Sequence, residues 1–234
     1  MPFARQTAVG RSTASGRADA AGRVDSSART VPTVPPDIIL LGDSITSACG
    51  IPAAQTNLSW YDSANTTLGN VFSLSRNAGI SGDTTALMLA RLQSDVLYYW
   101  SSWVCVLGGI NDITGAVASA TTIANLTAIY DAILAGGARL ICCVVLPCTS
   151  LNTGPLHTTV DAINTAIRAY AASHSPVVLC DWWSVFSDPN TDSGYSPVAG
   201  YTSDGKHPSA TGAGVMGTYL AGVVNAVKPG TAGV

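Results

Sequence analysis

Residues 38–46 of the chain read IILLGDSIT, and the rest of the sequence is best understood from this stretch. Four consecutive apolar residues are typical of a short strand that is buried on both faces. Gly42 then permits a sharp turn, and Ser44 follows directly. A serine in this position lies at the carboxyl end of a strand, where open α/β sheets bind their ligands. By itself the pattern also fits a turn residue or a helix cap.

From residue 37 onward, apolar runs typical of buried strands alternate with helical patterns. The predicted strands are 38–41, 71–74, 103–107, 140–146 and 177–180. The predicted helices are 84–99, 121–134, 160–172 and 210–227. This alternation indicates an α/β fold with a five-stranded parallel sheet covered on both faces. The longest irregular stretches, 47–70 and 182–206, then lie at the carboxyl edge of that sheet.

Composition narrows the class of protein. The 234 residues suffice for one large domain, and a 47% apolar share supports a sizeable core. A net charge of −3 gives no electrostatic reason to expect nucleic acid or an anionic membrane surface as a partner. No apolar run approaches the length of a transmembrane helix, and the start of the chain lacks the apolar core of a classical signal peptide. The location therefore stays open between the cytoplasm and a virion-like or extracellular assembly.

The six cysteines do not form a metal-binding pattern. Cys105, Cys142, Cys143 and Cys180 all fall in apolar runs, no Cys-x-x-Cys occurs, and no cluster of histidines accompanies them. We expect free, buried thiols that act as small apolar side chains, and no metal site.

Residues 1–36 differ from the rest of the chain and form a predicted region of their own, with 37–234 as the second. Their arginines recur every six residues, at Arg5, Arg11, Arg17, Arg23 and Arg29. This period favours an extended arm, since six residues would place the arginines on one side of an extended chain. A proline-rich linker follows. The arm is either a solvated polar leader or a segment that docks on a partner in a larger assembly.

A serine that transfers acyl groups needs a base, a group that orients the base, and donors for an oxyanion. His207 follows Asp204 by three residues in one loop, just before the last predicted helix. Such a pair would hold one imidazole tautomer and leave the other ring nitrogen for Ser44. The remaining histidines, His157 and His174, have no carboxylate in a comparable position.

Two further loops supply candidate donors at the same edge of the sheet. The loop 76–85 follows the second strand and is rich in glycine, so that a backbone N–H can approach an oxyanion closely. The loop 107–112 follows the third strand, and Asn111 within it can donate from its side chain. Among the loop aromatics, Tyr201 is the candidate for a contact with substrate.

These blocks resemble the SGNH hydrolases, also called GDSL esterases and lipases, over about residues 37–227. They occur in the order of that family, one after each expected strand, and no Gly-x-Ser-x-Gly elbow is present. The resemblance implies a flavodoxin-like three-layer α/β/α fold, with Ser44 as nucleophile, His207 as base and Asp204 as its orienter. It also implies an oxyanion hole made by the Ser44 N–H, a glycine N–H and Asn111. Gly82 is the preferred glycine, and Gly79 is the alternative.

The resemblance leads us to expect a serine esterase that needs neither a metal nor an organic cofactor. Its substrate would be a short acyl ester, such as an O-acetyl group on a carbohydrate, since no long apolar lid is visible in the sequence. A lysophospholipase or thioesterase is the alternative within the family. From a different class, the chain would be a structural or receptor-binding component of a phage-like assembly, attached or self-associated through residues 1–36.

Overall fold

The computed structural model describes residues 35–48, 59–151, 154–191 and 194–227. Its strands form one parallel sheet in the order β2-β1-β3-β4-β5. The strands are β1 (Asp37–Gly42), β2 (Ser73–Gly79), β3 (Trp103–Leu107), β4 (Arg139–Cys143) and β5 (Val177–Cys180). The strand order reverses between β1 and β3, as in flavodoxin-like folds, and ligands of such sheets bind at this point. The predicted five-stranded parallel sheet is confirmed.

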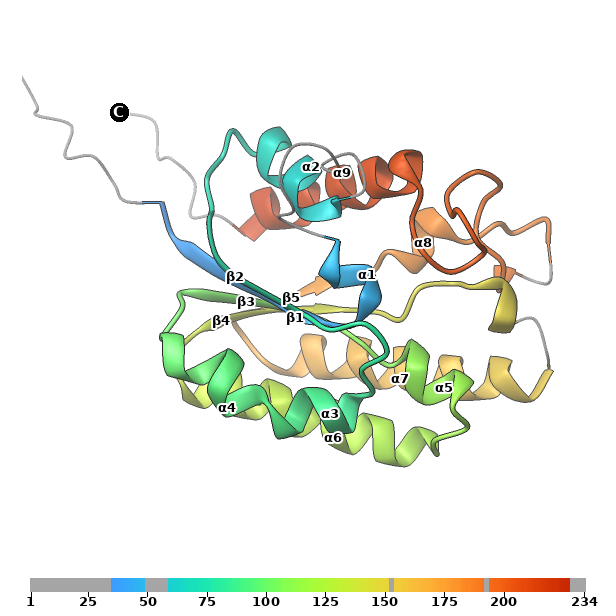
Figure 1. Ribbon diagram of the computed structural model, residues 1–234, viewed down its shortest axis with the longest axis horizontal. Coiled ribbons are helices and arrows are strands. Elements are labelled where there is room, and N and C mark those ends of the chain that lie inside the picture. The colour runs from blue at the N-terminus through green and yellow to red at the C-terminus, as the bar shows by residue number, and fades with distance from the viewer. Residues whose placement is uncertain (1–34, 49–58, 152–153, 192–193, 228–234) are drawn as a thin grey trace, which may run out of the picture. The chain divides into compact units, whose positions relative to one another are not determined.

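Helices cover both faces of the sheet and complete three layers (Figure 1). One layer contains α2 (Trp60–Thr67), α8 (Trp183–Phe186) and α9 (Ala210–Val227), with the short α1 (Ser44–Ser47) beside them. The other layer contains α3 (Thr85–Ala90), α4 (Leu92–Asp95), α5 (Ile110–Thr114), α6 (Ser119–Ala135) and α7 (Gly154–Ser173). The 3₁₀ turns η2 (Leu97–Tyr99) and η3 (Thr149–Leu151) lie in the connections.

The central strands were the easiest to predict, because both of their faces are covered. β1 lies between β2 and β3, and five of its six residues are buried. The edge strand β2 was predicted wrongly at 71–74, whereas it spans Ser73–Gly79. Its exposed and covered residues alternate along much of its length, so no continuous apolar run marks it.

The fourth strand is shorter than its apolar run, because its neighbour ends. β4 stops at Cys143, where β5 stops at Cys180. Residues 144–146 stay buried beyond the end of the strand, where only the Val144 N–H still bonds the Cys180 carbonyl of β5 among the described residues. The amide of Asn164 in α7 takes the place of the missing ladder: its Oδ1 accepts from the Val145 N–H at 2.8 Å and its Nδ2 donates to the Val145 carbonyl at 3.0 Å. A buried side chain thereby satisfies backbone groups that would otherwise be unpaired.

The helices differ from the sequence pattern in two places. The single helix predicted over 84–99 is divided into α3, α4 and η2, and the first break falls at Arg91, whose backbone is not helical. The helix α2 was missed inside a stretch expected to be irregular. Its signal was a capping serine, because the Ser59 Oγ accepts from the Asp62 N–H at 3.0 Å.

The last helix packs closely on the domain. α9 is long and apolar enough to meet a criterion of length and composition for a membrane span, contrary to the sequence expectation. It nevertheless contributes Met216 and Leu220 to the core. A Cβ on Gly217 would collide with Ser63 of α2, so the two helices touch along their backbones.

Two other sequence predictions concern the cysteines and the arm at 1–36, and the structure confirms the first and does not test the second. The thiols of Cys105, Cys142, Cys143 and Cys180 are free and buried, as expected. The predicted arm at 1–36 lies outside the described residues except for its last two prolines, so its extended form and its docking stay predictions.

Candidate active site

Ser44 occupies the second position after the central strand β1, which ends at Gly42. Gly42 is required just before it, because a Cβ there would collide with the Thr46 hydroxyl and the Leu107 carbonyl. The buried Asp43 then begins α1, accepting the Ile45 N–H on its Oδ1 at 2.9 Å. This cap turns the chain so that Ser44 is only partly covered at the carboxyl edge of the sheet.

The loop before α9 brings a histidine to this serine. His207 Nε2 lies 2.8 Å from Ser44 Oγ, and His207 Nδ1 lies 2.7 Å from Asp204 Oδ2. The other carboxylate oxygen, Oδ1, accepts the backbone N–H groups of Lys206 and His207 at 3.0 and 2.7 Å. Gly205 permits this tight turn with a φ of +84°. The structure thus joins three predicted residues in one hydrogen-bonded chain.

The Asp204 carboxylate is strongly stabilised in its charged form. The hydrogen bond from the His207 ring is the largest cause, and the two backbone donors add to it. Together they hold the pKa of Asp204 well below its usual range, so the carboxylate stays ionised wherever His207 can be neutral. An ionised partner at Nδ1 keeps the proton on that nitrogen and leaves Nε2 free to accept one.

The geometry distinguishes between the two candidate glycines. The Gly79 N–H donates to the Asn77 Oδ1 at 2.8 Å, so it is already used. Gly82 has a φ of +84°, and among the described residues no acceptor takes its N–H. This favours Gly82 over Gly79 as an oxyanion donor.

Asn111 lies against the loop that carries Gly82. Its Nδ2 donates to the carbonyl of Asp83, the next residue, at 2.9 Å. An amide nitrogen carries two hydrogens, so a second donor remains for a ligand. The neighbouring Asp112 has a different place: it is buried and accepts from the N–H and hydroxyl of Thr85, which holds the start of α3 behind this loop.

Two cations that sequence reasoning missed connect these loops. Arg91 donates to the Asp83 carboxylate at 2.6 Å and to the Gly42 carbonyl at 3.0 Å, so it ties the end of β1 to the Gly82 loop. Lys206 Nζ donates to the Asn111 Oδ1 at 2.7 Å. Neither contact can be predicted from the local sequence. Arg91 and Gly42 are 49 residues apart in the chain, and Lys206 and Asn111 are 95 residues apart.

The loop aromatics mostly anchor the loops. Trp60 and Trp182 are fully buried, with ring centroids 5.1 Å apart, and each donates its indole N–H to a backbone carbonyl. Tyr201 is the predicted substrate contact. Its half-buried ring packs against the ring of Phe186, with the two ring centroids 5.3 Å apart. This contact is one of anchoring, and the role of Tyr201 in binding stays a prediction.

The other two histidines each stack on a tyrosine ring. His157 stacks on Tyr195, and Asp161 accepts from the Tyr195 hydroxyl. His174 stacks on Tyr170. Within the described part of the chain, no group of three or more His, Cys, Asp or Glu side chains is arranged to hold a metal ion.

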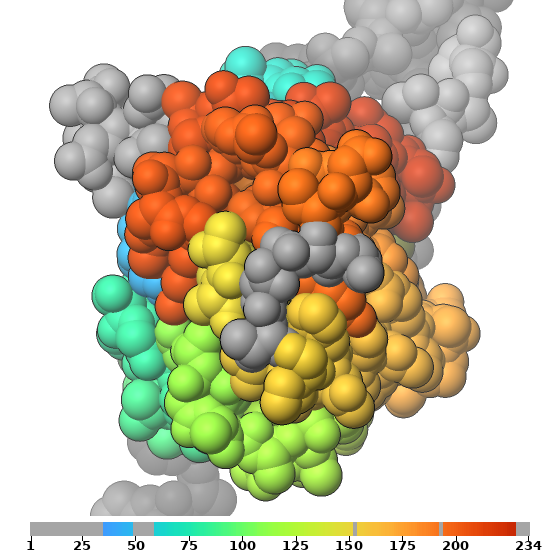
Figure 2. All heavy atoms as spheres, turned by 90° about the vertical axis from the view of Figure 1, so that its right-hand side faces the viewer, coloured from blue at the N-terminus to red at the C-terminus, as the bar shows by residue number. Residues whose placement is uncertain are grey.

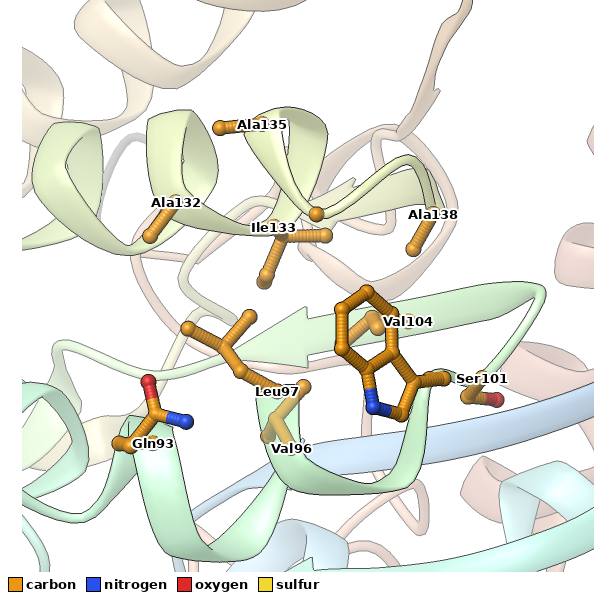
Figure 3. A pocket seen from close by; sticks show the side chains of 11 residues that line it. Gln93, Val96, Leu97, Ser101, Val104, Ala132, Ile133, Ala135 and Ala138 are labelled. Atoms are coloured by element: carbon orange, nitrogen blue, oxygen red, sulfur yellow. The ribbon is translucent and has the colours of Figure 1, made fainter. Parts of the chain in front are cut away.

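The carboxyl edge of the sheet faces the viewer in Figure 2. There the orange-red segment that includes the 204–207 loop borders a small blue patch from the segment around α1, at the left of the view. A separate pocket of about 410 Å³ lies between η2 and α6 (Figure 3). It is lined mainly by apolar residues such as Leu97 and Ile133 and lies beside the start of β3, away from Ser44, so it is not the reaction site.

Comparison with known sequences identifies the family of the chain. The model of the GDSL-like Lipase/Acylhydrolase family matches residues 40–215, which include the end of β1, every strand that follows and the loops described above. The chain belongs to this family. All five candidate residues lie within the residues that match this family: Ser44, Gly82, Asn111, Asp204 and His207. No protein among the curated sequences compared matches the chain.

Solved structures of family members share the fold. A GDSL-like lipase from Bacteroides thetaiotaomicron has a TM-score of 0.65 at 20% identity, covering 83% of this chain and 90% of its own. TesA has a TM-score of 0.65 at 23% identity, covering 82% of this chain and 99% of its own. An acetyl xylan esterase has a TM-score of 0.64 at 17% identity, covering 82% of this chain and all of its own. These likenesses concern the fold of the acylhydrolase, not its substrate.

The buried Asp43 carboxyl gives a testable pH dependence. Burial raises its pKa from 3.8 to about 6, against the opposing hydrogen bond from the Ile45 N–H. Between pH 4 and 6 the Asp43 carboxyl is therefore more protonated in the folded protein than in the unfolded chain, and the contribution of this group to stability falls as the pH rises. Asp43→Asn removes this titration while keeping a capping oxygen. From pH 4 to pH 7 we expect the wild type to lose about 2 kcal/mol of unfolding free energy relative to this variant.

Urea unfolding of both proteins at several pH values measures the difference. Stability curves that run parallel from pH 4 to pH 7 would show that Asp43 titrates normally, and the assigned effect of burial would then be wrong.

Proposed function

We propose that the chain is a serine esterase in which Ser44 attacks the ester carbonyl. The observation that carries this proposal is the hydrogen-bonded chain from Ser44 Oγ through His207 to Asp204. His207 Nε2 takes the serine proton during attack and returns it to the leaving alcohol, which yields an acyl-enzyme. Water then attacks the acyl-enzyme with His207 again as base, releasing the acid and restoring the serine.

The negative charge that develops on the ester oxygen needs donors that are in place before reaction. The Ser44 N–H, the Gly82 N–H and the second hydrogen of Asn111 Nδ2 are the proposed three. The proposal is supported by two hydrogen bonds to Asp83, the residue after Gly82, which hold the loop in place. Asn111 holds the Asp83 carbonyl, and Arg91 holds the Asp83 carboxylate.

The proposed substrate class is short acyl esters, with O-acetyl groups on carbohydrate as the leading example. The absence of a long apolar lid in the sequence supports a short acyl chain, and a solved acetyl xylan esterase shares the fold. Nitrophenyl esters from acetate to palmitate test the length of the acyl chain. An acetylated oligosaccharide, a lysophospholipid and an acyl thioester test the alcohol or thiol part of the substrate. We expect the highest kcat/KM for acetyl esters. A maximum at long chains or on the thioester would instead establish a lysophospholipase or thioesterase.

A second proposal concerns residues 1–36, whose arginines recur every six residues. We propose that they attach the catalytic domain to a partner in a larger assembly, or to other copies of this chain. Size-exclusion chromatography of the full chain and of a variant lacking 1–36 tests self-association. Identical elution of both as monomers would rule out self-association through residues 1–36, and a solvated polar leader or a different partner would then explain them.

A further inference from the structure

Lys206 reaches from the histidine loop to the opposite side of the site. It lies between Asp204 and His207 in sequence, yet its side chain runs to Asn111, where Nζ donates to Oδ1 at 2.7 Å. Asn111 in turn donates from Nδ2 to the Asp83 carbonyl at 2.9 Å. A continuous set of hydrogen bonds therefore links the loop of the proposed base with the loop of the proposed oxyanion donor Gly82.

This contact, together with the bond from Nδ2 to the Asp83 carbonyl, fixes the orientation of the Asn111 amide. The two ends of an asparagine amide have nearly the same shape, but one accepts hydrogen bonds and the other donates. An ammonium group carries donors only, so it can bond the oxygen and would repel the amino group. Lys206 thereby holds Oδ1 toward itself and Nδ2 toward the Gly82 loop. A bond to a charged donor is also stronger than one between neutral groups, and it polarises the amide so that its N–H becomes a better donor.

We propose that Lys206 is a positioning residue that acts on the reaction through Asn111. The proposal rests on the proposed function, because it needs Asn111 to serve the oxyanion. Its contribution belongs to the transition state, where negative charge develops on the ester oxygen, and not to the binding of neutral ester. Lys206 itself does not need to contact substrate.

The first test is Lys206→Met, which keeps the length of the stem and removes the ammonium. We expect kcat to fall by about 10- to 50-fold with KM changed less than about twofold, because weakening a donor costs less than the 10²–10³-fold of deleting it. Lys206→Arg retains a charged donor and should recover a large part of the loss. Lys228→Met removes the only other lysine with the same change of charge and should leave kcat within about twofold.

The decisive test is a double-mutant cycle with Asn111→Ala. If Lys206 acts only through Asn111, Lys206→Met should lower the activity of the Asn111→Ala enzyme by less than about twofold. A further tenfold loss in that background would mean that Lys206 acts on substrate or on His207 directly, and it would overturn the proposal. Unchanged kcat in the Lys206→Met single variant would overturn it as well. Assays at pH 8 lie well above the pKa of about 6 of Asp43, so that carboxyl does not confuse the comparison.

Failure of this inference is distinguishable from failure of the proposed function. If the wild type hydrolyses esters and Ser44 reacts with a fluorophosphonate, the esterase proposal stands whatever Lys206 does. If the wild type does neither, the esterase proposal falls, and the Lys206 proposal falls with it. Thermal melting of each variant separates a loss of kcat from a loss of folded protein.

Discussion

Replacing Ser44 with alanine will lower ester hydrolysis by about 10⁴-fold or more, as expected when the nucleophile of a serine triad is removed. The Ser44 hydroxyl is the group 2.8 Å from His207 Nε2, and alanine keeps the Cβ while removing only this oxygen. The change should barely affect folding, because Ser44 is only partly buried and Asp43, not Ser44, caps the helix. The measurement is kcat/KM on a nitrophenyl acetate, together with covalent labelling by a fluorophosphonate.

The labelling experiment separates the nucleophile from any other reactive hydroxyl. Wild type should take up one label, and Ser44→Ala none. Ser184→Ala is the matched control, since Ser184 is an exposed serine of α8 whose hydroxyl, among the described residues, bonds only the Asp181 carbonyl. That variant should label and turn over like the wild type. Near-normal turnover by Ser44→Ala would remove Ser44 from the mechanism.

The second large effect is expected at Asn111. Asn111→Ala should lower kcat by about 10²–10³-fold with little change in KM, because its donor acts mainly on the charged transition state. The loss has two parts: the missing hydrogen bond to the oxyanion, and the lost bond from Nδ2 to the Asp83 carbonyl, which holds the Gly82 loop. Steady-state kinetics on the same ester separate kcat from KM.

The exposed Asn190 offers a control of the same residue type. Within the part of the chain that the structure describes, its side chain bonds only Asp188 in its own turn, so Asn190→Ala should behave as wild type. If Asn111→Ala raised KM and left kcat unchanged, Asn111 would bind substrate in the ground state, and its role in an oxyanion hole would be wrong.

Local sequence was sufficient where one segment contains the whole signal. The strand β3 spans the predicted residues, because a strand between two others is apolar on both faces. The pairing of Asp204 with His207 was also predictable, since both lie in one turn that Gly205 permits. Edges of the sheet were less predictable: β2 carries polar residues and was misplaced.

By itself, then, the sequence determined the α/β class, the central strands and the candidates Ser44, Asp204 and His207. Only the tertiary structure decided how the site is held. The Gly79 N–H donates to the Asn77 side chain, so that of the two candidate N–H groups only that of Gly82 stays available. Lys206 meets Asn111 although 95 residues separate them in the chain. The physical reason is that hydrophobic periodicity is a property of one segment, whereas a hydrogen bond between two loops depends on where the sheet places both of them.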